Sequence, residues 1–126
     1  MKYKRILLID DDEDDQELFQ LALRGTGINI ECKVMASARE ALLSLEMNPT
    51  DTDLIFLDLN MPLMTGQQFL AELKKRQPLN GIPVVVLSTS SDSETIFQAK
   101  NLDAKNFFTK PSDFHELKKI LQNILG

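Results

Sequence analysis

The chain has 126 residues, of which 43% are apolar and 26% charged, with one cysteine and a formal net charge of −5. This size and mixture are typical of one globular domain with its own core, and they exclude a disordered, collagen-like or disulfide-stapled chain. The acidic excess disfavours binding to a nucleic-acid backbone, and no apolar run approaches the roughly 18 residues of a membrane-spanning helix. The N-terminal segment reaches acidic residues after a few apolar ones, so we expect no signal peptide and a cytoplasmic location.

Five short apolar segments are spaced along the chain and predict β-strands. Three of them are continuous, which is typical of strands buried on both faces of a parallel sheet, and they span residues 6–9, 54–57 and 84–87. Residues 30–35 alternate apolar and polar side chains, a pattern that favours an edge strand, and residues 105–109 are the fifth candidate.

Apolar residues at helical spacing follow each predicted strand, and we interpret them as core-facing stripes of five helices. In chain order the stripes are Leu18, Leu21 and Ala22; Ala41, Leu42 and Leu45; Phe69, Leu70 and Leu73; Ile96, Phe97 and Ala99; and Phe114, Leu117, Ile120, Leu121 and Ile124. Capping boxes are expected where Ser37 precedes Glu40, Thr65 precedes Gln68 and Ser91 precedes Glu94, and Ser112 is expected to cap the last helix. Strand and helix alternate five times, which predicts an α/β sheet with helices on both faces, in one domain over residues 1–126.

Polar side chains come directly after four of the predicted strands. Asp10 and Asp11 follow the first strand, Asp58 follows the strand 54–57, Ser88 follows the strand 84–87, and Lys110 follows the last. Because ligands bind beyond the carboxyl ends of the strands in open α/β sheets, we expect these side chains to converge on one rim.

The predicted rim has the chemistry of phosphoryl transfer. Three clustered carboxylates repel one another unless a cation joins them, and an incomplete cage of oxygen ligands suits Mg²⁺. An ammonium and a hydroxyl, supplied by Lys110 and Ser88, can neutralise and hydrogen-bond phosphoryl oxygens. A carboxylate flanked by a metal and a lysine can act as a nucleophile, so we interpret the rim as a site for metal-assisted phosphoryl transfer onto Asp58.

The negative charge of the chain is concentrated in one segment, because seven of the eight residues from 10 to 17 are acidic. Carboxylates are favourable at the N-terminus of a helix. We therefore interpret Asp12, Asp14 and Asp15 as a solvated helix start rather than as metal ligands. The only histidine, His115, is interpreted as a solvent-facing helix residue, and Cys32 as a small buried hydrophobe.

Four motifs, in this order, resemble the receiver domain of the two-component response-regulator family. They are Ile9-Asp10-Asp11; Leu57-Asp58-Leu59-Asn60-Met61-Pro62 with Gly66; Leu87-Ser88-Thr89; and Thr109-Lys110-Pro111. The resemblance covers essentially the whole chain and is to the stand-alone, single-domain type, such as the chemotaxis response regulator. It implies a flavodoxin-like (βα)₅ fold with the strand order 2-1-3-4-5.

The resemblance also implies roles for the metal site. Asp58 would be the phosphoacceptor and a metal ligand, and Asp11 would bind Mg²⁺ directly. Asp10 would act through water, and Asn60 would contribute its backbone carbonyl.

A conformational switch is implied by the same resemblance. Ser88 would move toward the phosphoryl group, Phe107 would then turn inward, and Lys110 would pair with the phosphoryl group. The peptide bond between Lys110 and Pro111 would be cis. Three residues depart from the common pattern: Thr65 where Asp is frequent, Asp103 where Gly is usual and a left-handed backbone is expected, and Phe107 in place of a tyrosine.

The function implied is a signalling switch in a phosphorelay. A sensor histidine kinase or a histidine phosphotransfer protein would supply the phosphoryl group, and the domain would catalyse only its own phosphorylation and dephosphorylation. The face formed by the fourth helix, fifth strand and fifth helix would then regulate an unknown separate protein, without direct contact to nucleic acid or membrane. A regulator, a phosphate shuttle and a phosphate sink all stay open.

Three other functions compete with this interpretation. A haloacid-dehalogenase-like phosphatase would need a second acid two residues after Asp58, where Asn60 stands. A flavodoxin-like cofactor carrier would need a phosphate cradle after the first strand, where the acidic residues 10–15 repel phosphate. A degenerate receiver that binds partners without being phosphorylated is the third alternative, although all the expected site residues are present.

Overall fold

The computed structural model of the chain describes residues 3–89, 93–111 and 113–126. Its strands are β1 (Arg5–Ile9), β2 (Glu31–Met35), β3 (Leu54–Asp58), β4 (Val84–Ser88) and β5 (Asn106–Thr109). Its helices are α1 (Glu13–Gly25), α2 (Ala38–Met47), α3 (Gly66–Lys74), α4 (Ser93–Asn101) and α5 (Phe114–Leu125), with a short 3₁₀ turn, η1 (Leu79–Gly81), before β4.

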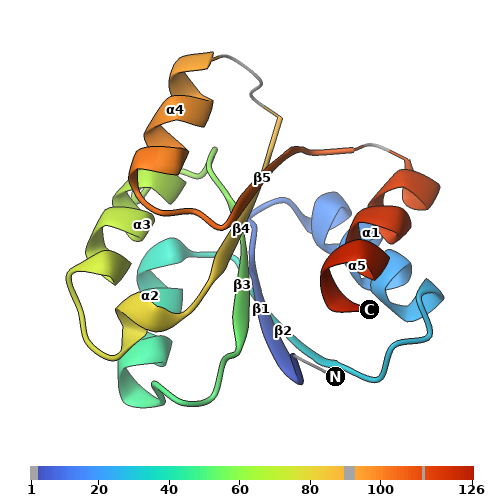
Figure 1. Ribbon diagram of the computed structural model, residues 1–126, viewed down its shortest axis with the longest axis horizontal. Helices are drawn as coiled ribbons and strands as arrows, with labels where there is room; N and C mark the ends of the chain where they lie inside the picture. Colours follow the sequence, from blue (N-terminus) through green and yellow to red (C-terminus); the bar gives the residue numbers. More distant parts are fainter. Residues whose placement is uncertain (1–2, 90–92, 112) are drawn as a thin grey trace.

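All five strands are parallel and lie in the order β2-β1-β3-β4-β5, with α2, α3 and α4 on one face and α1 and α5 on the other (Figure 1). This arrangement confirms the predicted flavodoxin-like α/β fold. The three continuous apolar segments are the three central strands, and β2 is an edge strand as its alternation predicted. In the part of the chain that the structure describes, no helix is long and apolar enough to cross a bilayer.

Two apolar clusters form the core, one on each face of the sheet, because successive side chains of a strand point to opposite faces. Ile9, Leu57 and Val86 belong to the cluster beneath α2 and α3, whereas Leu8 and Phe56 belong to the cluster beneath α1 and α5. The predicted stripes of α2 and α3 are fully buried.

Among the side chains that the structure describes, the predicted stripes of α1 and α4 each contain one residue that is exposed instead of buried. Leu21 is 44% exposed, because α1 packs instead through Phe19, whose ring lies 5.1 Å from that of Phe56, and through Ala22. Phe97 is 64% exposed while its neighbour Ile96 is half-buried. Consecutive helical residues point about 100° apart, so a narrow core face does not take both.

The helix starts agree in part with the predicted caps. Thr65 and Gln68 form the complete reciprocal capping box, and the Ser37 hydroxyl accepts the backbone N–H of Glu40 at 3.2 Å. Ser91 and Ser112 lie outside the described residues. The cap that the structure describes for α5 is Asp113, whose carboxylate accepts the backbone N–H of His115 at 2.8 Å.

The backbone conformation at two positions bears on the site. Asp103 has φ 61°, the left-handed conformation that was predicted for it. At Gly66, an added Cβ would lie 2.6 Å from Leu59 Cα and 2.8 Å from the carbonyl oxygen of Asp58. Only glycine therefore allows α3 to begin directly against the end of β3 that carries Asp58.

We expect Gly66→Ala to lower the free energy of unfolding by about 1–3 kcal/mol, the usual cost of overpacking, because the clash is with backbone atoms. Urea unfolding of the two proteins measures this difference. Gly81→Ala is the matched control, since a Cβ at Gly81 meets nothing within 4 Å. Equal losses in the two variants would contradict the role of close approach at Gly66.

Candidate functional site

The carboxyl ends of four strands bring the predicted site residues together. Asp10 follows β1, Asp58 ends β3, Ser88 ends β4 and Lys110 follows β5, and parallel pairing places these ends on one edge of the sheet. Asp10 and Asp58 are only 2% and 6% exposed, and Ser88 is fully buried. The convergence predicted from the strand ends is confirmed by this geometry.

Lys110 Nζ lies at the centre of the rim. It is 2.7 Å from Asp10 Oδ2, 2.6 Å from Asp15 Oδ2 and 3.5 Å from Asp58 Oδ2. The backbone N–H of Lys110 donates to the carbonyl oxygen of Ser88 at 2.7 Å, which continues the pairing of β5 with β4 by one residue. This backbone bond aims the lysine side chain over the end of the sheet.

The predicted cis peptide bond between Lys110 and Pro111 is wrong. Among the described residues, the cis bond is the one between Gln77 and Pro78. The Lys110 ammonium reaches the carboxylates without it, because the backbone hydrogen bond to Ser88 already fixes where the lysine leaves the strand.

Burial raises the pKa of Asp10 above its ordinary value, against the Lys110 ammonium and the backbone N–H of Asp12, which act in the opposite direction. Burial likewise raises the pKa of Asp58, against the attraction of Lys110 and the backbone N–H of Asn60. Burial alone would lower the pKa of Lys110, but its hydrogen bonds to Asp10 and Asp15 outweigh this effect and raise it. The Lys110 ammonium therefore offsets only part of the cost of burying these two carboxylates in their charged form.

Three carboxylates of the rim have the arrangement of a cation site. One oxygen each from Asp10, Asp11 and Asp58 lies within 4.8 Å of the other two. Asp11 is exposed, so the cluster is open to solvent on one side. Hard oxygen donors, two of them buried, with one open side fit a hard divalent cation that keeps some of its water. The three carboxylates predicted to cluster thus lie together where such a cation would relieve charge repulsion, whereas the carbonyl of Asn60 stays a predicted ligand.

Asn60 contacts both the aspartate and the hydroxyl of the rim. Its backbone N–H donates to Asp58 Oδ1 at 3.2 Å. Its side-chain amide donates to Ser88 Oγ at 3.3 Å and to Thr89 Oγ1 at 3.0 Å. The side-chain contacts were not expected, since only the carbonyl of Asn60 was assigned a role. Phe107, the expected switch aromatic, is half-buried against the cluster beneath α2 and α3.

Part of the interpretation of the acidic helix start is wrong. Asp12 is the N-cap of α1 and Asp14 is exposed, as expected, but Asp15 pairs with Lys110. The spacing between Asp12 and Asp15 could have indicated this ion pair. Side chains of a helix tilt toward its N-terminus, so an acid three residues after the cap points back toward the strand ends.

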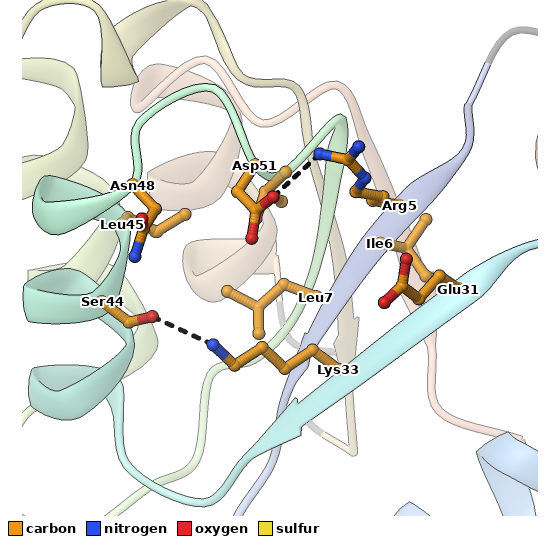
Figure 2. Close-up of a pocket in the computed structure, with 10 residues that line it drawn as sticks. Arg5, Ile6, Leu7, Glu31, Lys33, Ser44, Leu45, Asn48 and Asp51 are labelled. Atoms are coloured by element: carbon orange, nitrogen blue, oxygen red, sulfur yellow. Dashed lines mark hydrogen bonds and ion pairs between the residues drawn. The ribbon is translucent and has the colours of Figure 1, made fainter.

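A separate small pocket lies at the other end of the strands from the rim, where β1 and β2 begin (Figure 2). Its cavity of about 50 Å³ has room for a few water molecules, compared with about 300–1,000 Å³ for small-molecule sites. Both of its basic side chains have partners within the pocket: Arg5 pairs with Asp51 at 2.8 Å, and Lys33 donates to Ser44 at 3.2 Å. These features favour a structural role for this pocket.

Comparison with known proteins identifies the family of the chain. The model of the response regulator receiver domain matches residues 6–122. The response regulator Rcp1 of Synechocystis sp. is 33% identical over 96% of this chain and 86% of its own length. The rice two-component response regulator ORR1 is 31% identical over 92% of this chain and 53% of its own length.

Solved structures show the same similarity in three dimensions. The phosphorylated cyanobacterial phytochrome response regulator RcpA superposes with a TM-score of 0.87 at 35% identity, over 97% of this chain and 91% of that one. A Mn²⁺-bound form of Rcp1 superposes with a TM-score of 0.85 at 33% identity, over 96% and 91% of the two chains. The chain belongs to the family of response regulator receiver domains of two-component signalling, in which phosphorylation of an aspartate is the general mechanism. The resemblance is confirmed, and the degenerate receiver is the alternative that still needs a test.

In the metal-free protein, we expect Asp58→Asn to raise the free energy of unfolding at pH 7 by about 1 kcal/mol, the usual scale of single-residue effects. The substitution removes a buried charge whose pKa is raised. In the wild type, the contribution of Asp58 to stability rises as the pH falls from its raised folded pKa toward the unfolded value near 4, because the folded state binds this proton more readily. The advantage of the variant therefore shrinks on acidification, which chemical unfolding with a chelator measures.

Asp53→Asn is the matched control with the opposite sign. The Asp53 carboxylate accepts backbone N–H groups of Lys4 and Arg5 at 2.9 Å each, and these bonds hold its pKa below the ordinary value. Its stabilisation is present above the unfolded pKa and is lost as the pH falls through the folded pKa. We expect this variant to be slightly less stable at pH 7. A shift of both variants in the same direction would contradict the electrostatic account.

Proposed function

We propose that Asp58 accepts a phosphoryl group from a phosphohistidine donor in a Mg²⁺-dependent reaction, and that the domain thereby switches the face formed by α4, β5 and α5. The single observation that carries this proposal is the position of Lys110 Nζ, 3.5 Å from Asp58 and bound to Asp10, at the rim where the three carboxylates meet. An ammonium beside a buried, cation-demanding carboxylate cluster is the charge arrangement that phosphoryl transfer to a carboxylate requires.

In the proposed reaction, a carboxylate oxygen of Asp58 attacks the phosphorus of the donor. The new phosphorus–oxygen bond forms as the phosphorus–nitrogen bond breaks. The electron pair of the broken bond stays on the nitrogen of the departing imidazole. The backbone N–H of Asn60 holds the other Asp58 oxygen, Oδ1, at 3.2 Å and so orients the carboxylate. Lys110 neutralises the phosphoryl oxygens, and water later hydrolyses the acyl phosphate and restores Asp58.

The metal would be held by the carboxylates of Asp11 and Asp58 and the backbone carbonyl of Asn60, with Asp10 acting through water. The Mn²⁺-bound form of Rcp1 supports a divalent cation in this family. When bound, Mg²⁺ supplies positive charge that shields the nucleophile from the incoming phosphoryl oxygens. The remaining work belongs to the chain itself, which positions Asp58, Ser88 and Lys110.

The proposed switch uses the pairing between β4 and β5. Ser88 lies opposite Thr109 in this pair, one residue before Lys110, and Phe107 lies two residues further back along β5. Movement of Ser88 toward the phosphoryl group would be followed by inward rotation of Phe107. Phosphorylation would then shift the population between two conformations of the face to which β5 belongs.

The partners proposed for this switch are a sensor histidine kinase or a histidine phosphotransfer protein upstream and a separate protein downstream. The domain would act in the cytoplasm and would catalyse only its own phosphorylation and dephosphorylation, so we do not class it as an enzyme. Signalling regulator, phosphate shuttle and phosphate sink are distinguished by the downstream protein and not by the chemistry of the rim.

Incubation with acetyl phosphate and Mg²⁺ is expected to add the mass of one phosphoryl group to the intact wild-type protein. The gain should disappear without Mg²⁺ and in Asp58→Asn, and should survive in Asp53→Asn, which makes the same chemical change at the opposite edge of the sheet. Intact-protein mass spectrometry measures the gain. Absence of labelling in the wild type, where another receiver is labelled in parallel, would favour the degenerate receiver.

Lys110→Ala is expected to leave Mg²⁺ affinity at least as high as in the wild type, because it removes a positive charge and no metal ligand. The same variant should lose the conformational response to phosphorylation, since nothing would then pair with the phosphoryl group from the side of β5. Backbone amide shifts of residues 106–109, measured by NMR before and after phosphorylation, report that response. Wild-type shifts in the variant would remove Lys110 from the switch.

A further inference from the structure

The three carboxylates around Lys110 do not share its ammonium equally. Asp10 and Asp15 lie within hydrogen-bond distance of Nζ, at 2.7 and 2.6 Å, whereas Asp58 is 3.5 Å away. In this arrangement the ammonium is committed to the two carboxylates that do not take the phosphoryl group. Two of the three N–H donors of the ammonium serve Asp10 and Asp15, so a phosphoryl group on Asp58 would compete with these two carboxylates for Lys110.

Asp15 is the partner that can release the ammonium at least cost. The side chain of Asp10 is 3% exposed, so an unpaired Asp10 would be a buried charge, which is strongly destabilising. The side chain of Asp15 is 34% exposed, so water can solvate it once Lys110 leaves. Asp15 also lies in the first turn of α1, where the helix dipole favours a negative charge.

We propose that Asp15 is a positioning residue that holds the Lys110 ammonium on the α1 side of the site, and that Lys110 leaves Asp15 when Asp58 gains a phosphoryl group. The release part of this inference rests on the proposed function. The ion pair between Asp15 and Lys110 stabilises the unphosphorylated state and is lost in the phosphorylated one, so it opposes switching. Asp15 thereby ties the first turn of α1 to the state of Asp58.

The first experiment tests whether Asp15 holds the Lys110 ammonium, and it needs no phosphorylation. Wild type, Asp15→Asn and Asp14→Asn are treated briefly with an amine-acetylating reagent, and peptide mass spectrometry compares labelling of Lys110 with that of the exposed Lys119. Asp14 is an exposed residue of the same helix turn, so its variant makes the same change in net charge. We expect Lys110 labelling to rise about two- to fivefold in Asp15→Asn only, the scale of a partly exposed ion pair.

The second experiment tests, at equilibrium, whether Lys110 leaves Asp15 when Asp58 carries a phosphoryl mimic. Beryllium fluoride, which mimics a phosphoryl group on a carboxylate, is titrated into each protein at saturating Mg²⁺ and followed by ¹⁹F NMR. Removing the competing acceptor should tighten binding about two- to fivefold in Asp15→Asn relative to Asp14→Asn. Asp15→Glu, which keeps the carboxylate, should return affinity toward the wild-type value.

The outcomes separate this inference from the proposed function. Equal Lys110 labelling in Asp15→Asn and Asp14→Asn overturns the claim that Asp15 holds the Lys110 ammonium, whatever the result with beryllium fluoride. If Lys110 labelling rises in Asp15→Asn but the two variants bind beryllium fluoride equally well, the claim that Lys110 leaves Asp15 is overturned. A wild type that binds no beryllium fluoride and accepts no phosphoryl group overturns the proposed function and the release together, while raised Lys110 labelling in Asp15→Asn would still support the hold.

Discussion

One ammonium group among mutually repelling carboxylates is the interaction on which the site depends. Lys110 Nζ bridges Asp10 and Asp15 and approaches Asp58, while Asp11 brings further negative charge to the same edge of the sheet. One positive charge cannot balance this set, and the ammonium only partly offsets the burial that raises the pKa of both Asp10 and Asp58. The imbalance gives the rim its demand for a divalent cation. Several carboxylates also share this one ammonium, and we propose that it changes partners when charge is added to Asp58.

The fold serves this charge cluster by bringing four strand ends to one edge. The central strands are buried on both faces, so their ends cannot shift without disturbing two apolar clusters. Gly66 allows α3 to begin against β3, and the backbone N–H of Asn60 orients the Asp58 carboxylate from the same turn. On the other side of the site, the hydrogen bond from Lys110 to the carbonyl of Ser88 links the ammonium to the pairing of β4 with β5.

The sequence was informative where a residue type has one dominant physical role. Continuous apolar segments predicted the central strands, and polar residues after those segments predicted the rim, because parallel strands must end together. The sequence was less informative where several arrangements satisfy the same pattern. Apolar residues surround α1 on more than one side, so only the contact of Phe19 with Phe56 decides that Leu21 faces solvent. Asp15 belongs to a run of acids whose local role as a helix start is the same for each, and its distinction comes from a lysine 95 positions away. The peptide bond before Pro111 was assigned from the family pattern alone, and local physics did not determine it.

The position of the acyl phosphate in the chain is the most direct test of Asp58 as the phosphoacceptor. Borohydride reduces an aspartyl phosphate to homoserine, and tandem mass spectrometry then locates the altered residue after incubation with acetyl phosphate and Mg²⁺. The account predicts homoserine at position 58 and aspartate at positions 10, 11 and 15. Homoserine at one of those three positions, or at none while another receiver is modified in parallel, would contradict the assignment of Asp58 as the phosphoacceptor.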